Sequence, residues 1–197
     1  MSKWADRRQQ LKSDSDYDPL TSIPMMEPNQ FDITKARLRI TKAFDSAGAK
    51  NITIIDPYLL ESDIQTILHL FATQSERNIT VITFLNKFKT CEQKSAPKIE
   101  TAKILKSITD DLKTKGIFSS FEIIVTNFEF HDRFFICTDD DKESIVIASG
   151  GSLSMFLTKY TSLIRVTNRT FKRALFDFIG LAKSKGSNLA AYIGEKA

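Results

Sequence analysis

The chain has 197 residues, of which 42% are hydrophobic and 26% are charged, and its formal net charge is +4 at pH 7. These proportions are typical of a soluble globular protein, and the length suits one domain plus an arm but not two ordinary domains. No apolar run approaches the roughly 20 residues that span a bilayer, and no apolar segment follows the basic N-terminus, so we expect a cytoplasmic protein without a secretory signal.

The N-terminal residues mix charges, serines and proline turns with little periodicity, which predicts a flexible arm at 1–29. One domain is expected over 30–185, followed by a C-terminal tail at 186–197 that could form a short helix. Within the domain, apolar residues at helical spacing alternate with short continuous apolar runs. The pattern predicts helices at about 32–47, 61–76, 96–114 and 170–183, and strands at 51–56, 78–85, 121–126 and 162–166.

The order of these elements predicts the fold class. Strands that alternate with helices early in the chain favour parallel pairing with helices packed on the sheet. A hairpin later in the chain adds antiparallel strands. We therefore expect an α/β fold with a mixed, mainly parallel β-sheet that helices flank on both faces.

The most informative stretch is Phe130–Phe156, which reads FHDRFFICTDDDKESIVIASGGSLSMF. Two runs of strand formers flank an acidic turn at Asp139–Asp141, which is typical of a β-hairpin. His131 and Arg133 stand at the entrance of this hairpin, and Gly150–Ser152 stand at its exit. Because both ends of a hairpin lie close in space, these side chains and this glycine corner should converge on one spot.

The convergent residues suit phosphate chemistry. His131 and Arg133 fall on one face of an extended segment, because side chains alternate along a strand. Arg133 and the backbone N–H groups of Gly151 and Ser152 could hold a phosphate, and the His131 imidazole could then attack its phosphorus. Lys159 could reach the same phosphate or could simply lie on the surface. The alternative is a structural histidine followed by an ordinary loop.

These residues resemble the phospholipase D superfamily of phosphodiesterases, whose motif is His-x-Lys, four residues, Asp, and then a Gly-Ser-x-Asn corner. The segment His131–Arg133 matches the first part, with arginine in place of lysine. The segment Gly151–Ser154 matches the corner, with serine in place of asparagine. Thr138 stands where the motif has its aspartate, and Asp139 follows it.

The resemblance extends over about 31–183, because NITIIDPYL and RVTNRTFKRALFDFIGLAK are also similar to segments of the family's nuclease-like members. It implies a metal-independent phosphodiesterase with a phospholipase-D-like fold and no cofactor. One histidine would attack phosphorus to give a phosphohistidine, a second would protonate the leaving oxygen, and water would release the product. His69, the only other histidine, falls on a predicted helix surface, so the second histidine would be the His131 of another copy in a homodimer.

The resemblance also implies roles for neighbouring residues. Arg133 retains the cation of the motif and can bind phosphate through two hydrogen bonds, and Ser152 would donate a further one. Ser154 stands at the position of the motif asparagine. The acidic residues that could replace the missing aspartate are Glu129, Asp132 and Asp139.

Our first hypothesis is a nuclease, because the charge distribution favours nucleic acid over a membrane. Lys87–Lys115 contains eight lysines against four acids, and Lys159–Lys185 contains seven basic residues against one acid. Such clusters could attract a polyanion, or they could be ordinary solvated helix faces. The variant motif is similar to phospholipase-D-like proteins of prokaryotic mobile elements and defence loci, which suggests antiviral defence.

The second hypothesis is a catalytically degenerate phospholipase-D-like subunit that binds nucleic acid or a protein partner in a larger complex. The N-terminal arm, with the only tryptophan at Trp4, could contact that partner. A third reading is an α/β domain whose Gly-Ser corner is only structural. In none of the three do we expect a membrane partner.

Overall fold

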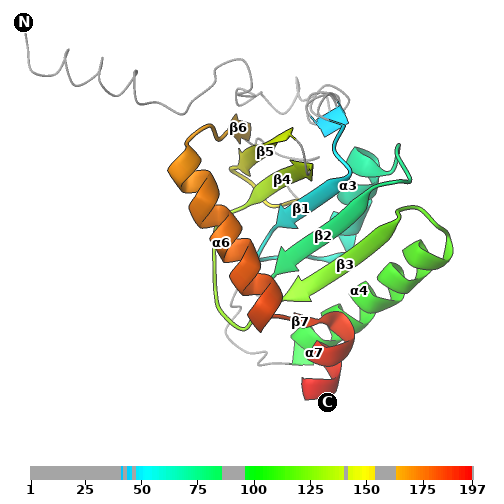
Figure 1. Cartoon of the computed structure of the whole chain (residues 1–197). Helices are drawn as coiled ribbons and strands as arrows, with labels where there is room; N and C mark the ends of the chain where they lie inside the picture. Colours follow the sequence, from blue (N-terminus) through cyan, green and yellow to red (C-terminus); the bar gives the residue numbers. More distant parts are fainter. Residues whose placement is uncertain are drawn as a thin grey trace, which may run out of the picture.

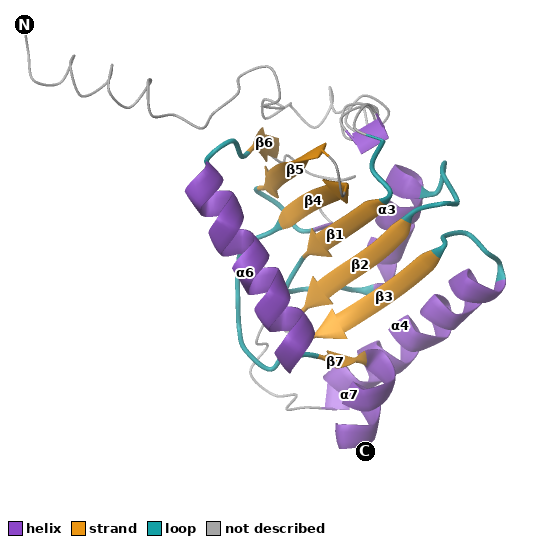
Figure 2. Ribbon diagram, in the orientation of Figure 1, coloured by secondary structure: helices purple, strands orange, loops and turns teal. Residues whose placement is uncertain are grey.

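The computed structural model describes residues 41, 44, 45, 48–85, 96–139, 142–153 and 163–196. The predicted arm, most of the helix predicted at 32–47 and three residues singled out above lie outside this part of the chain. Those three residues are Trp4, Ser154 and Lys159. In the described residues, a seven-stranded sheet is accompanied by four helices (Figures 1 and 2).

The strands of the sheet run in the order β6-β5-β4-β1-β2-β3-β7. In chain order they are β1 (Asn51–Ile55), β2 (Asn78–Thr83), β3 (Ser120–Val125), β4 (Phe134–Asp139), β5 (Lys142–Ser149), β6 (Leu163–Arg165) and β7 (Ser187–Asn188). The helices are α3 (Glu61–Phe71), α4 (Ala96–Thr114), α6 (Arg169–Lys185) and α7 (Leu189–Lys196). None of these helices is long and apolar enough to cross a membrane.

The α/β class and the mixed sheet agree with the prediction, but the expected predominance of parallel pairing was wrong. The pairs β1–β2 and β2–β3 are parallel, whereas β1–β4, β3–β7, β4–β5 and β5–β6 are antiparallel. A tight turn can join only antiparallel neighbours, so the hairpin β4–β5 gives the sheet one antiparallel pair directly. That hairpin then inserts β4 beside β1 in the centre of the sheet (Figure 1).

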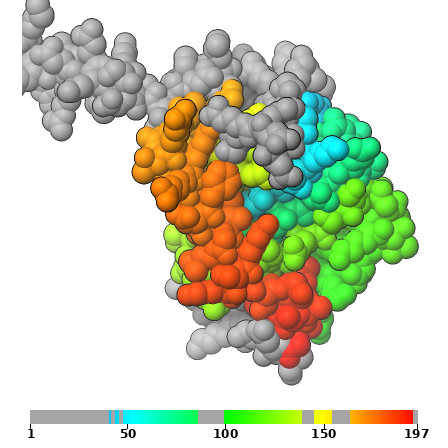
Figure 3. Space-filling view, in the orientation of Figure 1, coloured from blue at the N-terminus to red at the C-terminus, as the bar shows by residue number. Residues whose placement is uncertain are grey.

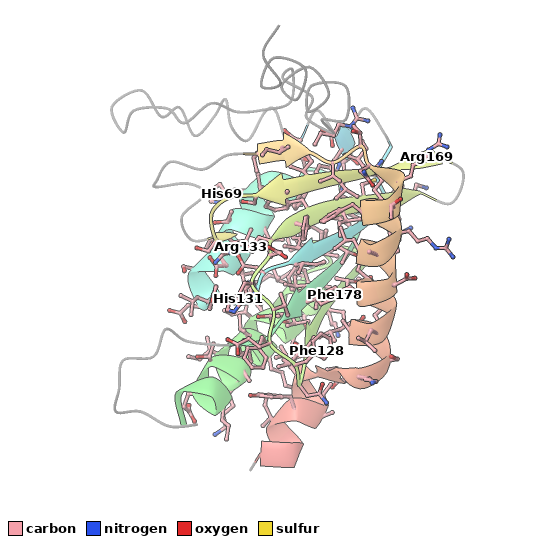
Figure 4. All side chains as sticks on the ribbon, turned by 90° about the vertical axis from the view of Figure 1, so that its left-hand side faces the viewer. His69, Phe128, His131, Arg133, Arg169 and Phe178 are labelled. Carbon is pink, nitrogen blue, oxygen red and sulfur yellow. The ribbon has the colours of Figure 1, made fainter. Side chains whose placement is uncertain are left out.

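Two buried apolar clusters cover different sides of the strands. Ile52 and Ile54 of β1 share one cluster with buried residues of α3 and α4, whereas Ile55 shares the other with Leu175 and Ile179 of α6. Because successive residues of a strand point to opposite faces, the two clusters lie on opposite faces of the sheet. In Figure 4 the sheet is seen with α6 along one side.

The helix α3 ends at Phe71, five residues before the predicted end at 76. The buried side chain of Arg77 fills this region, since its Nη1 donates to the Phe71 carbonyl at 3.4 Å and its Nε donates to the Ala49 carbonyl at 3.2 Å. Arg77 also forms an ion pair with Asp45. The arginine thus satisfies the Phe71 carbonyl, one of the groups at the end of the helix that have no partner within it.

The C-terminal residues pack against the rest of the domain. β7 pairs antiparallel with the end of β3, where Val125 lies opposite Ser187. Leu189 of α7 is buried in the same apolar cluster as the buried residues of α4. Between α6 and β7 the backbone of Gly186 lies close to β3 and to the end of α6. An added Cβ there would lie 2.6 Å from both the Ala182 carbonyl oxygen and Ile124 Cγ2, so only a glycine fits without a shift of its neighbours.

The tight packing around Gly186 predicts that Gly186→Ala lowers the free energy of unfolding by about 1–3 kcal/mol, because overpacking forces neighbours to shift. Urea denaturation measures this change. The matched control is Gly180→Ala in the middle of α6, where an added Cβ meets no atom within 4 Å. That change should stabilise the protein by roughly 0.5–1 kcal/mol, since alanine is the better helix former. Equal urea midpoints for the two variants would contradict the packing argument.

Candidate functional site

The site is built around Asp56, the residue that follows β1. Its side chain is 1% exposed. Oδ1 accepts the Tyr58 N–H at 2.9 Å, and Oδ2 accepts the Leu153 N–H at 2.9 Å. Burial raises the pKa of this carboxyl, while the two N–H groups and the nearby Arg133 charge act against that rise. The carboxylate therefore joins the end of β1 to the corner that follows β5.

Arg133 directly precedes β4 and is partly buried beside Asp56. Its Nε lies 3.6 Å from Asp56 Oδ1, which is an ion pair too long for a hydrogen bond. Its guanidinium carbon lies 5.1 Å from the centre of the Tyr58 ring, within the range of a cation–π contact. The Arg133 carbonyl accepts the Ser149 N–H at 2.9 Å, so the two ends of the hairpin meet at this residue.

His131 lies next to Tyr58. The Tyr58 hydroxyl oxygen and His131 Nδ1 are 3.1 Å apart, and either group can donate this hydrogen bond, depending on the imidazole tautomer. His131 Nε2 lies 3.7 Å from Glu129 Oε1, and the histidine side chain is 70% exposed. Tyr58 thus contacts both the imidazole and the guanidinium, which fall on one side of the chain as the alternation predicted. Figure 4 labels both side chains.

The Gly-Ser corner is fastened to the domain more tightly than the sequence suggested. Gly151 and Ser152 are buried, with Ser152 only 8% exposed. Ser149 Oγ donates to the Gly151 carbonyl at 2.8 Å, and the Gly151 N–H points to the same Oγ at 3.4 Å. The Leu153 carbonyl lies 3.5 Å from Thr66 Oγ1 of α3. The corner is therefore held by β1 and α3, and its roles in phosphate binding stay predictions.

A second buried carboxyl, Asp63, lies in the first turn of α3. Its Oδ2 accepts the Leu60 N–H at 2.6 Å, which caps the helix, while Oδ1 has no hydrogen-bond partner among the described residues. Burial raises the pKa of Asp63 to about 7. The Leu60 N–H and the Arg133 charge act against this rise, and the Asp56 charge adds to it.

Of the acidic candidates, Glu129 lies beside His131, whereas Asp139 and Asp132 lie apart from this group. Phe134 pairs with Ile55 at the end of β1 near the site, whereas Thr138 pairs with Asn51 at the opposite end. Asp139 therefore lies about 16 Å from Phe134 along β4, at roughly 3.3 Å a residue. Asp56 takes the place beside Arg133 instead. Asp132 points to a different pocket, described below.

His69 is exposed on α3, and its Nδ1 lies 2.7 Å from the Gln65 carbonyl of its own helix. This placement agrees with the prediction of a helix-surface residue. Among the described residues, no three His, Cys, Asp or Glu side chains gather closely enough to hold a metal ion.

Sequence reasoning missed Asp56, Tyr58 and Asp63. A recognisable pattern was present, because Asp56 follows a buried strand directly and the carboxyl ends of parallel strands are the usual location of sites in α/β sheets. The link from Tyr58 to His131 was not visible in this way, since the two residues are 73 positions apart.

The two basic clusters differ in the structure. On α4 three lysines form surface ion pairs with acids one turn away, Lys103 with Glu100, Lys106 with Asp110, and Lys115 with Asp111. On α6, by contrast, four exposed basic residues form no ion pair with any described residue. They are Arg169, Arg173, Lys183 and Lys185. Figure 3 shows α6 on the surface of the molecule.

No protein-family model and no curated protein matches this chain. Among solved structures, the chain is similar to a polyphosphate kinase from Porphyromonas gingivalis with a TM-score of 0.49 and 13% identity, covering 93% of this chain and 26% of the kinase. It is also similar to TrmBL2, an archaeal chromatin protein with a novel mode of DNA binding, with a TM-score of 0.40 and 13% identity, covering 94% of this chain and 62% of that one. The chain spans less than two thirds of either protein. Both likenesses are weak, and neither assigns a function.

The raised pKa of Asp63 predicts how stability depends on pH. An aspartate in the unfolded chain has a pKa near 4, so the folded state holds its proton more tightly, and stability falls as pH rises from about 4 to 7. Asp63→Asn removes this dependence. The variant should gain roughly 1–4 kcal/mol relative to the wild type between pH 4 and pH 8, at about 1.4 kcal/mol for each pKa unit.

Urea denaturation at a series of pH values measures this difference. The control is Asp177→Asn, which changes an exposed carboxylate of α6 and should follow the pH profile of the wild type. Parallel profiles for the wild type and Asp63→Asn would show that Asp63 does not titrate in this range.

Proposed function

We propose that this chain is a metal-independent phosphodiesterase of the phospholipase-D-like type, acting as a nuclease. The observation that supports it best is the shared contact of Tyr58 with His131 and Arg133, which holds an imidazole beside a guanidinium. Because Tyr58 engages Nδ1, the nucleophile in this proposal is Nε2, which lies 3.7 Å from Glu129 Oε1. A phosphate bound to the outer nitrogens of Arg133 would then stand in reach of that nitrogen.

The proposed reaction has two displacements. His131 Nε2 attacks phosphorus, and a P–N bond forms as the bond from phosphorus to the leaving oxygen breaks. The leaving oxygen takes a proton from the His131 of a second copy, because His69 contacts the Gln65 carbonyl of its own helix and has no contact with the residues of the site among those described. A water oxygen then attacks phosphorus, the P–N bond breaks, and the water proton restores the second imidazole. A homodimer with paired His131 side chains is therefore part of the proposal.

Nucleic acid is the proposed substrate because of α6. Its four exposed basic residues, with Asp177 as the only acid of the helix, supply a field that attracts a phosphate backbone. We further propose a role in prokaryotic antiviral defence, in the cytoplasm, which the resemblance to phospholipase-D-like proteins of mobile elements and defence loci supports by analogy.

The decisive test is cleavage of labelled single- and double-stranded DNA and RNA in EDTA. His131→Ala should abolish cleavage, because it removes the nucleophile and, in the dimer, the acid. The matched control is His69→Ala, which removes the other exposed histidine and should retain full activity. Equal cleavage by the wild type and His131→Ala would refute the phosphohistidine mechanism.

Tyr58→Phe tests the positioning role of the hydroxyl. The ring stays beneath Arg133, but the contact with Nδ1 is lost, so we expect kcat to fall about 10- to 100-fold, the range seen when groups that orient metal-bound histidines are removed. KM should change much less. Tyr192→Phe, the same substitution on α7, is the control. An unchanged kcat for Tyr58→Phe would show that the imidazole needs no such support.

A second candidate function is a degenerate subunit that binds nucleic acid or a protein partner. The closed Gly-Ser corner favours it, because Ser152 is buried and the Gly151 N–H already points to Ser149 Oγ. In the assay above, a well-folded wild type that binds nucleic acid in a salt-dependent way without cleaving it would select this candidate.

A further inference from the structure

An apolar pocket lies on the other side of the segment that carries the site. It has a volume of about 230 Å³ and lies between Phe130–Phe134 and α6. Its lining residues are Ile55, Phe130, Asp132, Phe134, Phe171, Ala174, Leu175 and Phe178. Side chains alternate along this segment, so its even-numbered residues face the pocket, whereas His131 and Arg133 face the other way and contact Tyr58.

Two pairs of aromatic rings form the walls of the pocket. The ring centres of Phe130 and Phe178 are 5.3 Å apart, and those of Phe134 and Phe171 are 5.7 Å apart. Because Phe171 and Phe178 are separated by two helical turns, the two pairs stand about 10 Å apart along α6. Ala174 leaves space between them on the helix. Figure 4 shows Phe178 between α6 and the segment near Phe128.

The pocket offers one charge and no side-chain donor. Asp132 is its only polar lining residue, is exposed, and forms no ion pair with any residue that the structure describes. The basic residues Arg169 and Arg173 fall on another side of α6, because the lining positions 171, 174, 175 and 178 make up a single helix face. In Figure 4, Arg169 is at the start of α6, away from Phe178.

We propose that this pocket binds the side chain of an arginine or lysine from a protein partner. Aromatic ring faces attract cations, and the Asp132 carboxylate supplies the opposite charge. The alkyl stem of such a side chain would pack on Ile55 and Leu175 at the same time. The volume lies below the range of about 300–1,000 Å³ for drug-sized ligands, which fits a single side chain.

A nucleobase fits the lining less well. Every base carries acceptor atoms, and no lining side chain can donate to them. The phosphate attached to such a base would also meet the Asp132 carboxylate. An arginine or lysine brings donors only, and Asp132 is an acceptor only.

The test compares N-acetyl-arginine amide with N-acetyl-citrulline amide, its uncharged isostere, in NMR titrations of the full ¹⁵N-labelled chain. The arginine compound should shift the amide resonances of 130–134 and 171–178, and the citrulline compound should bind at least about three-fold more weakly, as expected for loss of one exposed cation–π contact or more. Guanosine and cytidine serve as base probes and should bind more weakly than the arginine compound.

Variants locate the site. Asp132→Asn should weaken binding of the arginine compound about two- to five-fold, as expected for loss of an exposed ion pair, whereas Asp177→Asn, an exposed carboxylate of α6 outside the pocket, should not. Phe171→Ala should also weaken it, whereas Leu181→Ala should not, although the two side chains are similarly exposed at 45% and 41%. Because Phe171 and Asp132 are exposed, both variants should fold.

Three results would overturn the proposal. One is equal affinity for the arginine and citrulline compounds, and another is tighter binding of a nucleoside. The third is an equal effect of Asp132→Asn and Asp177→Asn. These outcomes are independent of nuclease activity, because no substrate cleavage is measured.

Discussion

The buried carboxylate of Asp56 is the constraint on which the site depends. A carboxylate removed from water is costly unless hydrogen bonds and an opposite charge compensate it. Asp56 receives two backbone N–H groups and lies beside Arg133, and one of those groups belongs to Leu153, which is 97 positions away in the chain. This requirement brings the end of β1, the entrance to β4 and the corner after β5 together at one point.

The position of Tyr58 depends on the same buried carboxylate. Its N–H donates to Asp56, so its backbone is fixed where β1 ends, and its ring then lies beneath Arg133. The hydroxyl at the far end of that ring contacts His131. The exposed imidazole is therefore linked to a buried charge through one aromatic side chain, which gives a surface histidine a defined orientation. Asp63 adds a second carboxyl nearby, whose burial raises its pKa.

A single extended segment serves both sides of the sheet. Residues 130–134 present His131 and Arg133 to Tyr58 and present Phe130, Asp132 and Phe134 to α6. The chemistry of the two sides differs, since one gathers groups suited to an anion and the other gathers aromatic rings and a carboxylate suited to a cation. A partner bound on the α6 side would contact the residues that adjoin the proposed catalytic histidine.

The sequence by itself determined the local elements. The helix predicted at 96–114 is α4, and the strands predicted at 51–56 and 121–126 agree with β1 and β3 within a residue, because periodicity depends on neighbours in the chain. The tertiary structure decided which residues meet. Strand order and register carried Asp139 to the far end of β4 and brought Asp56 to Arg133 instead. Contacts between residues more than 70 positions apart have no local pattern, so only the folded chain could show that Tyr58 holds His131.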